Sequence, residues 1–159
     1  MDPRKLTRIA LIAAVYVTVT MMFQAISFGI IQVRISEALT VLPYLTPTAV
    51  WGLFIGCFLA NLLGGFGLYD IVFGSLATLI AALLTWKMPR AYLAPLPPVL
   101  VNALVVGGYL SIILHQPYWF AAFYVGLGQV IACYALGYPL LLFLKQRPSF
   151  LSFLRGDEQ

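Results

Sequence analysis

Apolar stretches dominate the chain of 159 residues, and short breaks rich in proline, glycine or charged residues separate them. A helix needs about 20 mainly apolar residues to cross the hydrocarbon core of a membrane, although thin or distorted regions accept shorter ones. The pattern therefore predicts one domain, residues 1–159, built of six membrane-spanning helices. These cover residues 6–26, 33–45, 47–63, 68–86, 97–114 and 119–144.

The composition supports this all-α integral membrane class. Hydrophobic residues make up 62% of the chain and charged residues 9%, and the mean hydropathy is +0.98. A soluble domain carries about 25% charged residues, so we expect lipid to cover most of this surface. The first apolar stretch has a basic start but no small-residue cleavage site, and we interpret it as a retained helix. The chain is thus predicted to be a multi-pass protein of the cell membrane.

The basic residues predict the orientation of the helices, because lysine and arginine accumulate on the cytoplasmic side. With six crossings, the three basic clusters and both termini lie on that side; if residues 33–45 did not cross, the middle cluster would face outwards. Scattered clusters of this kind do not form a nucleic-acid-binding stripe. The clusters are Arg4, Lys5 and Arg8, then Lys87 and Arg90, then Lys145, Arg147 and Arg155.

Several polar side chains lie inside the apolar stretches, where a charge costs about 2.5–3.5 kcal/mol at the membrane centre. Such residues persist when they are paired, reach water or bind something. In the six-helix topology Arg34, Glu37, Asn61 and Asp70 gather towards the outer face. Gln129 lies deeper, and Asn102 is nearer the inner end of its helix by residue count.

Structural explanations exist for these residues as well. Arg34 and Glu37 are three residues apart and could neutralise each other. Asp70 could cap the fourth helix at its N-terminus. The buried amides could be interhelical hydrogen-bonding groups, and Trp119 could anchor its helix at the membrane interface. Taken together, two carboxylates, amides and nearby aromatic rings suit a flat, polar, heteroaromatic ligand.

Motifs for catalysis and energy conversion are missing. The sequence has no G-x-x-x-x-G-K-[ST] loop, no H-E-x-x-H, no G-x-S-x-G and no CxxC. A single histidine argues against a His-rich metal site, and we expect no cofactor. Cys57 and Cys133 are interpreted as small buried hydrophobic residues. The chain is therefore predicted to be a binding component that is energised by other subunits, not an enzyme.

Small residues recur every four positions at Gly52, Gly56, Ala60 and Gly64, which predicts close packing against another helix. Shorter versions of the pattern join Ala103 with Gly107 and Ala122 with Gly126. Ala10 and Ala14 form one more small-residue pair in the first helix.

The chain resembles the QueT family of queuosine-precursor substrate-binding (S) components of energy-coupling factor (ECF) transporters. The stretches that carry the resemblance cover residues 32–85, 93–110 and 124–142, and they include RISEALTVLP and DIVFGSLATLIAALLT. The resemblance implies a six-helix S-component fold with the ligand near the outer face. It also implies a transmembrane T subunit, which Ala10 and Ala14 would contact, and two ATPase subunits.

The cargo implied by the resemblance is a 7-deazaguanine, such as the aminomethyl pre-queuosine base or queuine. In this hypothesis Glu37 accepts the N–H pair of the guanine-like edge, and Asp70 or Gln129 meets the substituent. We expect Glu at the position of Gln129 in many relatives, a difference that bears on which precursor is bound. The remaining predicted contacts are Arg34, which orients Glu37 or meets a carbonyl oxygen, Asn61 and Asn102, which read ring acceptors, and Phe66, Tyr69 and Trp119, which stack.

Other functions remain open from the sequence. An S component for another flat vitamin, such as a pterin or a flavin, fits the same features. A membrane assembly protein would use the polar residues as interhelical contacts and would bind no small molecule, and a membrane enzyme would show turnover without ATPase subunits.

Overall fold

A computed structural model describes residues 2–27, 33–65 and 67–156, and these residues form helices and connections without a strand. Four of the elements differ from the α-helices: η1 and η3 are 3₁₀-helices, and η2 and η4 are π-helical turns. The elements are α1 (Pro3–Met22), α2 (Gln24–Ser27), η1 (Ile35–Tyr44), α3 (Thr48–Gly64), η2 (Asp70–Gly74), α4 (Ser75–Trp86), η3 (Ala91–Leu93), α5 (Leu96–Ile113), α6 (Tyr118–Val130), η4 (Ile131–Gly137), α7 (Tyr138–Lys145) and α8 (Pro148–Arg155).

The predicted all-helical class is confirmed, and the lengths of the helices are consistent with a membrane protein. Three helical stretches are long and apolar enough to cross a membrane, namely Pro3–Met22, Ala91–Ile113 and Tyr118–Lys145. Two shorter apolar helices cover Thr48–Gly64 and Asp70–Trp86. Each of these stretches matches a predicted helix to within a few residues at most of its ends. The α5 stretch starts earlier than predicted, because η3 leads into it.

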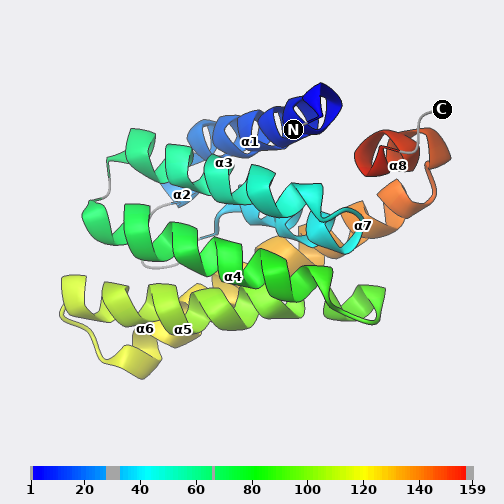
Figure 1. Cartoon of the computed structure of the whole chain (residues 1–159). Helices are drawn as coiled ribbons and strands as arrows, with labels where there is room; N and C mark the ends of the chain where they lie inside the picture. Colours follow the sequence, from blue (N-terminus) through cyan, green and yellow to red (C-terminus); the bar gives the residue numbers. More distant parts are fainter. Residues whose placement is uncertain (1, 28–32, 66, 157–159) are drawn as a thin grey trace.

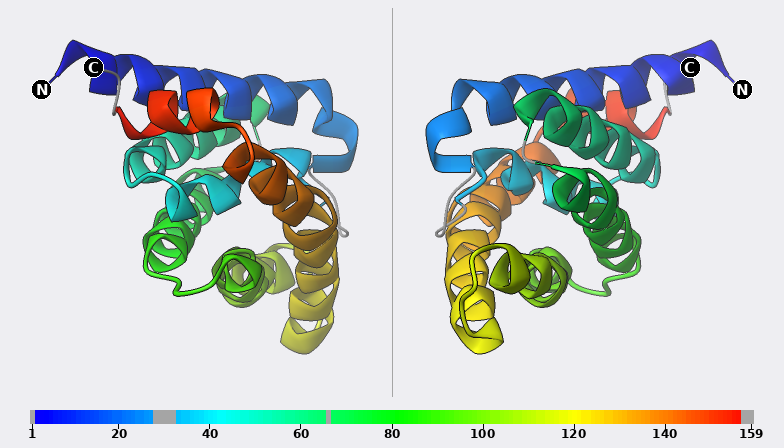
Figure 2. Two further views of the ribbon diagram at one scale, coloured as in Figure 1. Left: turned by 90° about the vertical axis from the view of Figure 1, so that its right-hand side faces the viewer. Right: turned by 90° about the vertical axis from the view of Figure 1, so that its left-hand side faces the viewer.

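The predicted second helix has an unexpected form. Residues Ile35–Tyr44 form a 3₁₀-helix of 10 residues with Pro43 inside it, although 3₁₀ runs longer than 3–4 residues are uncommon. This helix packs against α1, α3, α4, η4 and α7, and Figure 2 shows it in cyan between the surrounding helices. Because neighbours enclose it, η1 brings its polar side chains into the protein interior and away from lipid.

Small residues hold the helices close together, as predicted. A Cβ atom at Gly52 would lie 2.8 Å from Cβ of Ile12, and one at Gly56 would lie 2.9 Å from Cβ of Tyr16, so α3 contacts α1 at both glycines. At Gly107 a Cβ would approach the Ala122 Cα to 2.6 Å. The small-residue pairs of α5 and α6 therefore pack against each other.

The connections separate into two groups along the helix axes. Figure 1 shows the N-terminus, α8 and the connection between α4 and α5 at one end of the molecule. The connections from α3 to η2 and from α5 to α6 lie at the opposite end. The basic residues at the start of α1, after α4 and after α7 consequently share one end.

Candidate functional site

A buried carboxylate on η1 links three elements. Glu37 is 1% exposed, and its Oε1 accepts a 2.5 Å hydrogen bond from the hydroxyl of Tyr16 on α1. Its Oε2 accepts a 3.3 Å hydrogen bond from Nδ2 of Asn102 on α5. A buried charge is tolerated only when it is paired or hydrogen-bonded. Both oxygens of Glu37 are therefore held in place by side chains from neighbouring helices.

An ion pair lies beside this carboxylate. Nη2 of Arg34 is 4.0 Å from Oδ1 of Asp70, and the same Oδ1 accepts a 2.5 Å hydrogen bond from the hydroxyl of Tyr109 on α5. Arg34 also interacts electrostatically with Glu37. Arg34 is thus paired with Asp70, and simple neutralisation of Arg34 by Glu37 does not describe the arrangement.

Asp70 does not cap a helix. It is the first residue of the π-helical η2, Tyr69 takes the N-cap position, and no side-chain capping bond forms there. Its carboxylate is buried, with the whole residue 3% exposed. Its side chain is directed to Arg34 and Tyr109 instead, so the capping alternative is wrong.

One buried polar atom lacks a partner within the part of the chain that the structure describes. Nδ2 of Asn61 donates a 2.8 Å hydrogen bond to the backbone oxygen of Asp70. Because that carbonyl can only accept, the amide orientation is defined and Oδ1 is the remaining atom. Asn61 is 0% exposed, and its Oδ1 has no hydrogen-bond partner among the described residues. The side chain therefore offers an acceptor, whereas the sequence hypothesis had it donate to a ring acceptor.

Both cysteines are buried, as predicted, but they lie among polar groups. The Cys57 sulfur accepts hydrogen bonds of 3.2 Å from Thr78 Oγ1 and 3.4 Å from Asn61 Nδ2. The Cys133 thiol lies 3.5 Å from Oε1 of Gln129, to which it donates. It also lies 3.6 Å from the backbone oxygen of Glu37. Cys133 thereby connects Gln129 to η1.

Two of the residues that make these contacts lie in π-helical segments. Asp70 begins the π-helical η2, and Cys133 lies in the π-helical η4. Insertions of this kind are frequent at functional sites, because they turn side chains out of the regular helical register. We use the name polar cluster for Tyr16, Arg34, Glu37, Cys57, Asn61, Asp70, Asn102 and Tyr109, which these contacts join.

The predicted stacking residues lie in different places. The Tyr69 ring stacks on Tyr109 with centroids 6.4 Å apart, and Tyr69 is 49% exposed. It therefore lies at the edge of the polar cluster. Trp119 is 76% exposed and its ring contacts Tyr118, so the structure does not bring it to the cluster. Phe66 is outside the described residues.

The sequence hypothesis did not include the hydroxyl groups of Tyr16 and Tyr109. Both hydroxyls bind carboxylates. The available signal was a phenol in the middle of an apolar helix, because a buried tyrosine hydroxyl usually has a hydrogen-bond partner. Tyr16 also shares a buried face of α1 with Ile9, Ile12 and Thr20.

The polar cluster combines charged side chains with hydrogen-bonding hydroxyl and amide groups. Among the described residues no group of three or more His, Cys, Asp or Glu side chains could hold a metal ion. The cluster contains one guanidinium and two carboxylates, so its ionised form has an excess of negative charge. On the outside of the molecule, Ala10 and Ala14 are exposed on α1, and α3 packs on a different face of that helix.

Comparison with known proteins agrees with these features. A stretch of 74 residues, 45% of this chain, is 39% identical to the queuosine precursor transporter QueT of Lactococcus lactis subsp. cremoris (strain MG1363). That stretch spans 43% of the Lactococcus protein. No solved structure matches the chain at a comparable level of significance. The QueT transporter family matches residues 6–146, and the chain therefore belongs to this family of multi-pass membrane transport proteins.

Proposed function

We propose that the chain is the substrate-binding component of an ECF importer and that the polar cluster binds a queuosine precursor. The cargo is a 7-deazaguanine, such as the aminomethyl pre-queuosine base or queuine. A T subunit and two ATPase subunits energise its delivery into the cell. Family membership and the name of the Lactococcus relative support the cargo class, and the geometry of the cluster supports the location.

The observation that carries the proposal is the pair of buried acceptors, the Glu37 carboxylate and Asn61 Oδ1. A carboxylate has about four lone-pair positions, and Glu37 uses one on each oxygen for Tyr16 and Asn102. One position on each oxygen is left for the two parallel N–H groups of a guanine-like edge. Asn61 Oδ1 accepts a further N–H group, which removes the cost of about 1–3 kcal/mol for an unsatisfied buried acceptor.

The charge of the cluster favours a precursor with an amine. Arg34 is the single cation between Glu37 and Asp70, so a cationic aminomethyl group compensates the remaining negative charge. Asp70 or Gln129 lies next to this substituent, and Tyr69 stacks on the ring. Trp119 requires a rearrangement to take part, because it is 76% exposed.

We further propose that the chain crosses the membrane six times with both termini in the cytoplasm. The basic residues at the start of α1, after α4 and after α7 share one end of the molecule (Figure 1), as expected for a cytoplasmic face. η1 lies where the second crossing is predicted. Its 10 residues at about 2.0 Å per residue cover about two thirds of a hydrocarbon core, a length suited to a thin or distorted region of the membrane. The exposed Ala10 and Ala14 face is the contact for the T subunit.

The deciding experiment is calorimetric titration of the purified chain with the aminomethyl base, queuine, the nitrile precursor, a pterin and riboflavin. We expect the 7-deazaguanines to bind and the last two ligands not to bind. Glu37→Gln should lower the affinity at least roughly 100-fold, because one acceptor is replaced by a donor that faces the ligand N–H pair.

Folding must be checked separately, because Glu37 is buried. Asp70→Asn serves as the second variant, and thermal unfolding of each variant serves as the control. A Glu37→Gln protein that is folded and binds 7-deazaguanines as tightly as the wild type would contradict the proposal.

A further inference from the structure

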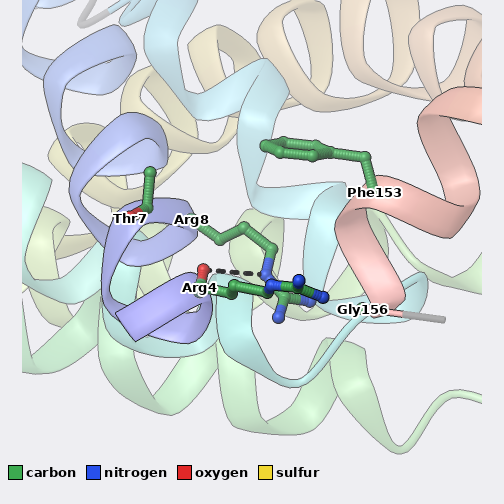
Figure 3. A pocket seen from close by; sticks show the side chains of 5 residues that line it. All are labelled: Arg4, Thr7, Arg8, Phe153 and Gly156. Atoms are coloured by element: carbon green, nitrogen blue, oxygen red, sulfur yellow. Dashed lines mark hydrogen bonds between the residues drawn. The ribbon is translucent and has the colours of Figure 1, made fainter. Parts of the chain in front are cut away.

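Away from the polar cluster, a cavity lies between the start of α1 and the end of α8. It has a volume of about 230 Å³ and is lined by Arg4, Thr7, Arg8, Phe153 and Gly156. Figure 3 shows Arg4 and Arg8 extending from α1 towards Gly156, with the Phe153 ring beside them. The cavity belongs to the end of the molecule that carries the basic clusters.

The position of Arg8 is defined by neutral acceptors. Its Nε donates to the backbone oxygen of Arg4 at 3.1 Å, and its Nη1 donates to the backbone oxygen of Leu154 at 3.2 Å. Gly156 adopts a positive φ of 84°, and a side chain there would collide with the Arg8 guanidinium. The end of α8 is thus shaped around a buried arginine that is 8% exposed.

The positive charge in this cavity is not neutralised by the described part of the chain. The only ion pair found among the described residues joins Arg34 to Asp70. The Arg4 side chain is exposed and makes no hydrogen bond within residues 2–27, 33–65 and 67–156. Two guanidinium groups therefore line one cavity without a carboxylate partner in those ranges, an arrangement that suits an anion.

An apolar groove adjoins the cavity and shares Arg8 and Phe153 with it. The groove has a volume of about 150 Å³, and its walls include Leu11, Val15, Leu39, Leu140 and Phe150. A free phosphate would use only the basic cavity. A phospholipid has an anionic head and an acyl chain, so it would use both spaces at once.

We propose that the cavity between α1 and α8 binds the phosphate headgroup of an anionic phospholipid, with one acyl chain in the adjoining groove. Basic pockets at the cytoplasmic ends of membrane helices are suited to such headgroups. Phe150, on the amphipathic α8, is 42% exposed and extends the apolar surface next to the site. The lipid would tie α8 to α1, and its binding does not depend on the transport cargo.

Native mass spectrometry of the full chain tests this proposal, with phosphatidylglycerol and phosphatidylcholine of identical acyl chains as probes. We expect phosphatidylglycerol to be retained in preference to phosphatidylcholine. Arg4→Gln should lower this retention about fivefold, the effect expected of one basic residue near the surface, and Arg4→Lys should preserve most of it. Lys87→Gln is the matched control, because it removes the same charge from an exposed position outside the cavity.

Additional measurements distinguish a bound phospholipid from other possible ligands of the cavity. Val15→Trp, which obstructs the groove, should also lower phosphatidylglycerol retention. The proposal is overturned if phosphatidylcholine is retained equally, or if Arg4→Gln and Lys87→Gln reduce retention to the same extent. It is likewise overturned if millimolar inorganic phosphate displaces the lipid while Val15→Trp has no effect, because the occupant would then be a free anion.

Discussion

The hydroxyl of Tyr16 on α1 donates a 2.5 Å hydrogen bond to Oε1 of Glu37 on η1. Tyr16 is 0% exposed and Glu37 is 1% exposed, so water cannot replace this donor. The contact ties the first helix, whose outer face carries Ala10 and Ala14, to the carboxylate at the centre of the polar cluster. It is thus a direct connection between the proposed partner surface and the proposed ligand site.

Replacing Tyr16 with Phe should destabilise the protein by about 1.5–3 kcal/mol, since the substitution removes a hydrogen bond to a buried charged group. It should also weaken ligand binding, because Glu37 loses the group that positions it. Thermal unfolding and calorimetry measure the two effects. Tyr138→Phe is the control, because the Tyr138 hydroxyl has no hydrogen bond to the described residues. Equal behaviour of the two variants would show that the Tyr16 contact is unimportant.

Asn61→Leu should affect ligand binding much more than ligand-free stability. The substitution removes the bond from Nδ2 to the Asp70 backbone oxygen and the weaker bond to the Cys57 sulfur. It also removes the unsatisfied Oδ1, so the loss and the gain should cancel to within about 1 kcal/mol. Ligand affinity should fall at least roughly tenfold, since an acceptor for the ligand is lost.

Asn102→Leu provides the contrast to this variant. It leaves Oε2 of Glu37 without its donor and should destabilise the ligand-free protein by about 1.5–3 kcal/mol. Unfolding midpoints and titrations on both variants separate the two behaviours. The assignment of Asn61 as a ligand acceptor fails if Asn61→Leu retains wild-type affinity.

Gly56→Ala should lower both the stability of the protein and its affinity for the ligand. The added Cβ would lie 2.9 Å from Cβ of Tyr16 and 3.1 Å from the backbone oxygen of Ala13, so α1 must move away from α3. We expect a loss of stability of about 1–3 kcal/mol and weaker ligand binding, because Tyr16 moves with α1.

Gly108→Ala is the matched change on α5. Its Cβ would be 3.6 Å from the nearest side-chain atom, an ordinary contact, and alanine is the better helix former. This variant should be neutral or more stable in thermal unfolding. A Gly56→Ala protein with wild-type stability would mean that α1 and α3 are not held at the observed distance.

Ala14→Trp should abolish association with a T subunit and leave ligand binding intact. Ala14 is exposed on α1, and the large ring would prevent close approach of a partner helix. Co-purification with co-expressed energising subunits measures association, and calorimetry on the isolated chain measures binding. Leu104→Trp, at a position 53% exposed on α5, should retain the partner. Retention by Ala14→Trp would exclude this face as the contact.

The sequence by itself was sufficient to predict the helical membrane class of the protein. It was also sufficient to predict that most of the polar side chains inside the apolar stretches lie together. Apolar stretches of this length have no stable place in water, so they become membrane helices. The same solvent argument predicts that Arg34, Glu37, Asn61 and Asp70 gather instead of facing lipid, and the structure brings these residues together. The spacing of Gly52 and Gly56 predicted close helix packing, because a glycine has no side chain to keep a neighbouring helix at a distance.

Only the tertiary structure decided which groups meet. Arg34 is three residues from Glu37 in the sequence, yet its ion pair is with Asp70. Arg34 has extended backbone just before η1 begins, so helical spacing does not fix its position relative to Glu37. Asn102, placed near the inner end by residue count, reaches Glu37, because the depth of a side chain depends on how its helix packs against its neighbours. The acceptor left on Asn61 likewise follows from the folded arrangement. Its Nδ2 group donates to the Asp70 backbone oxygen and to the Cys57 sulfur, and its Oδ1 has no partner among the described residues.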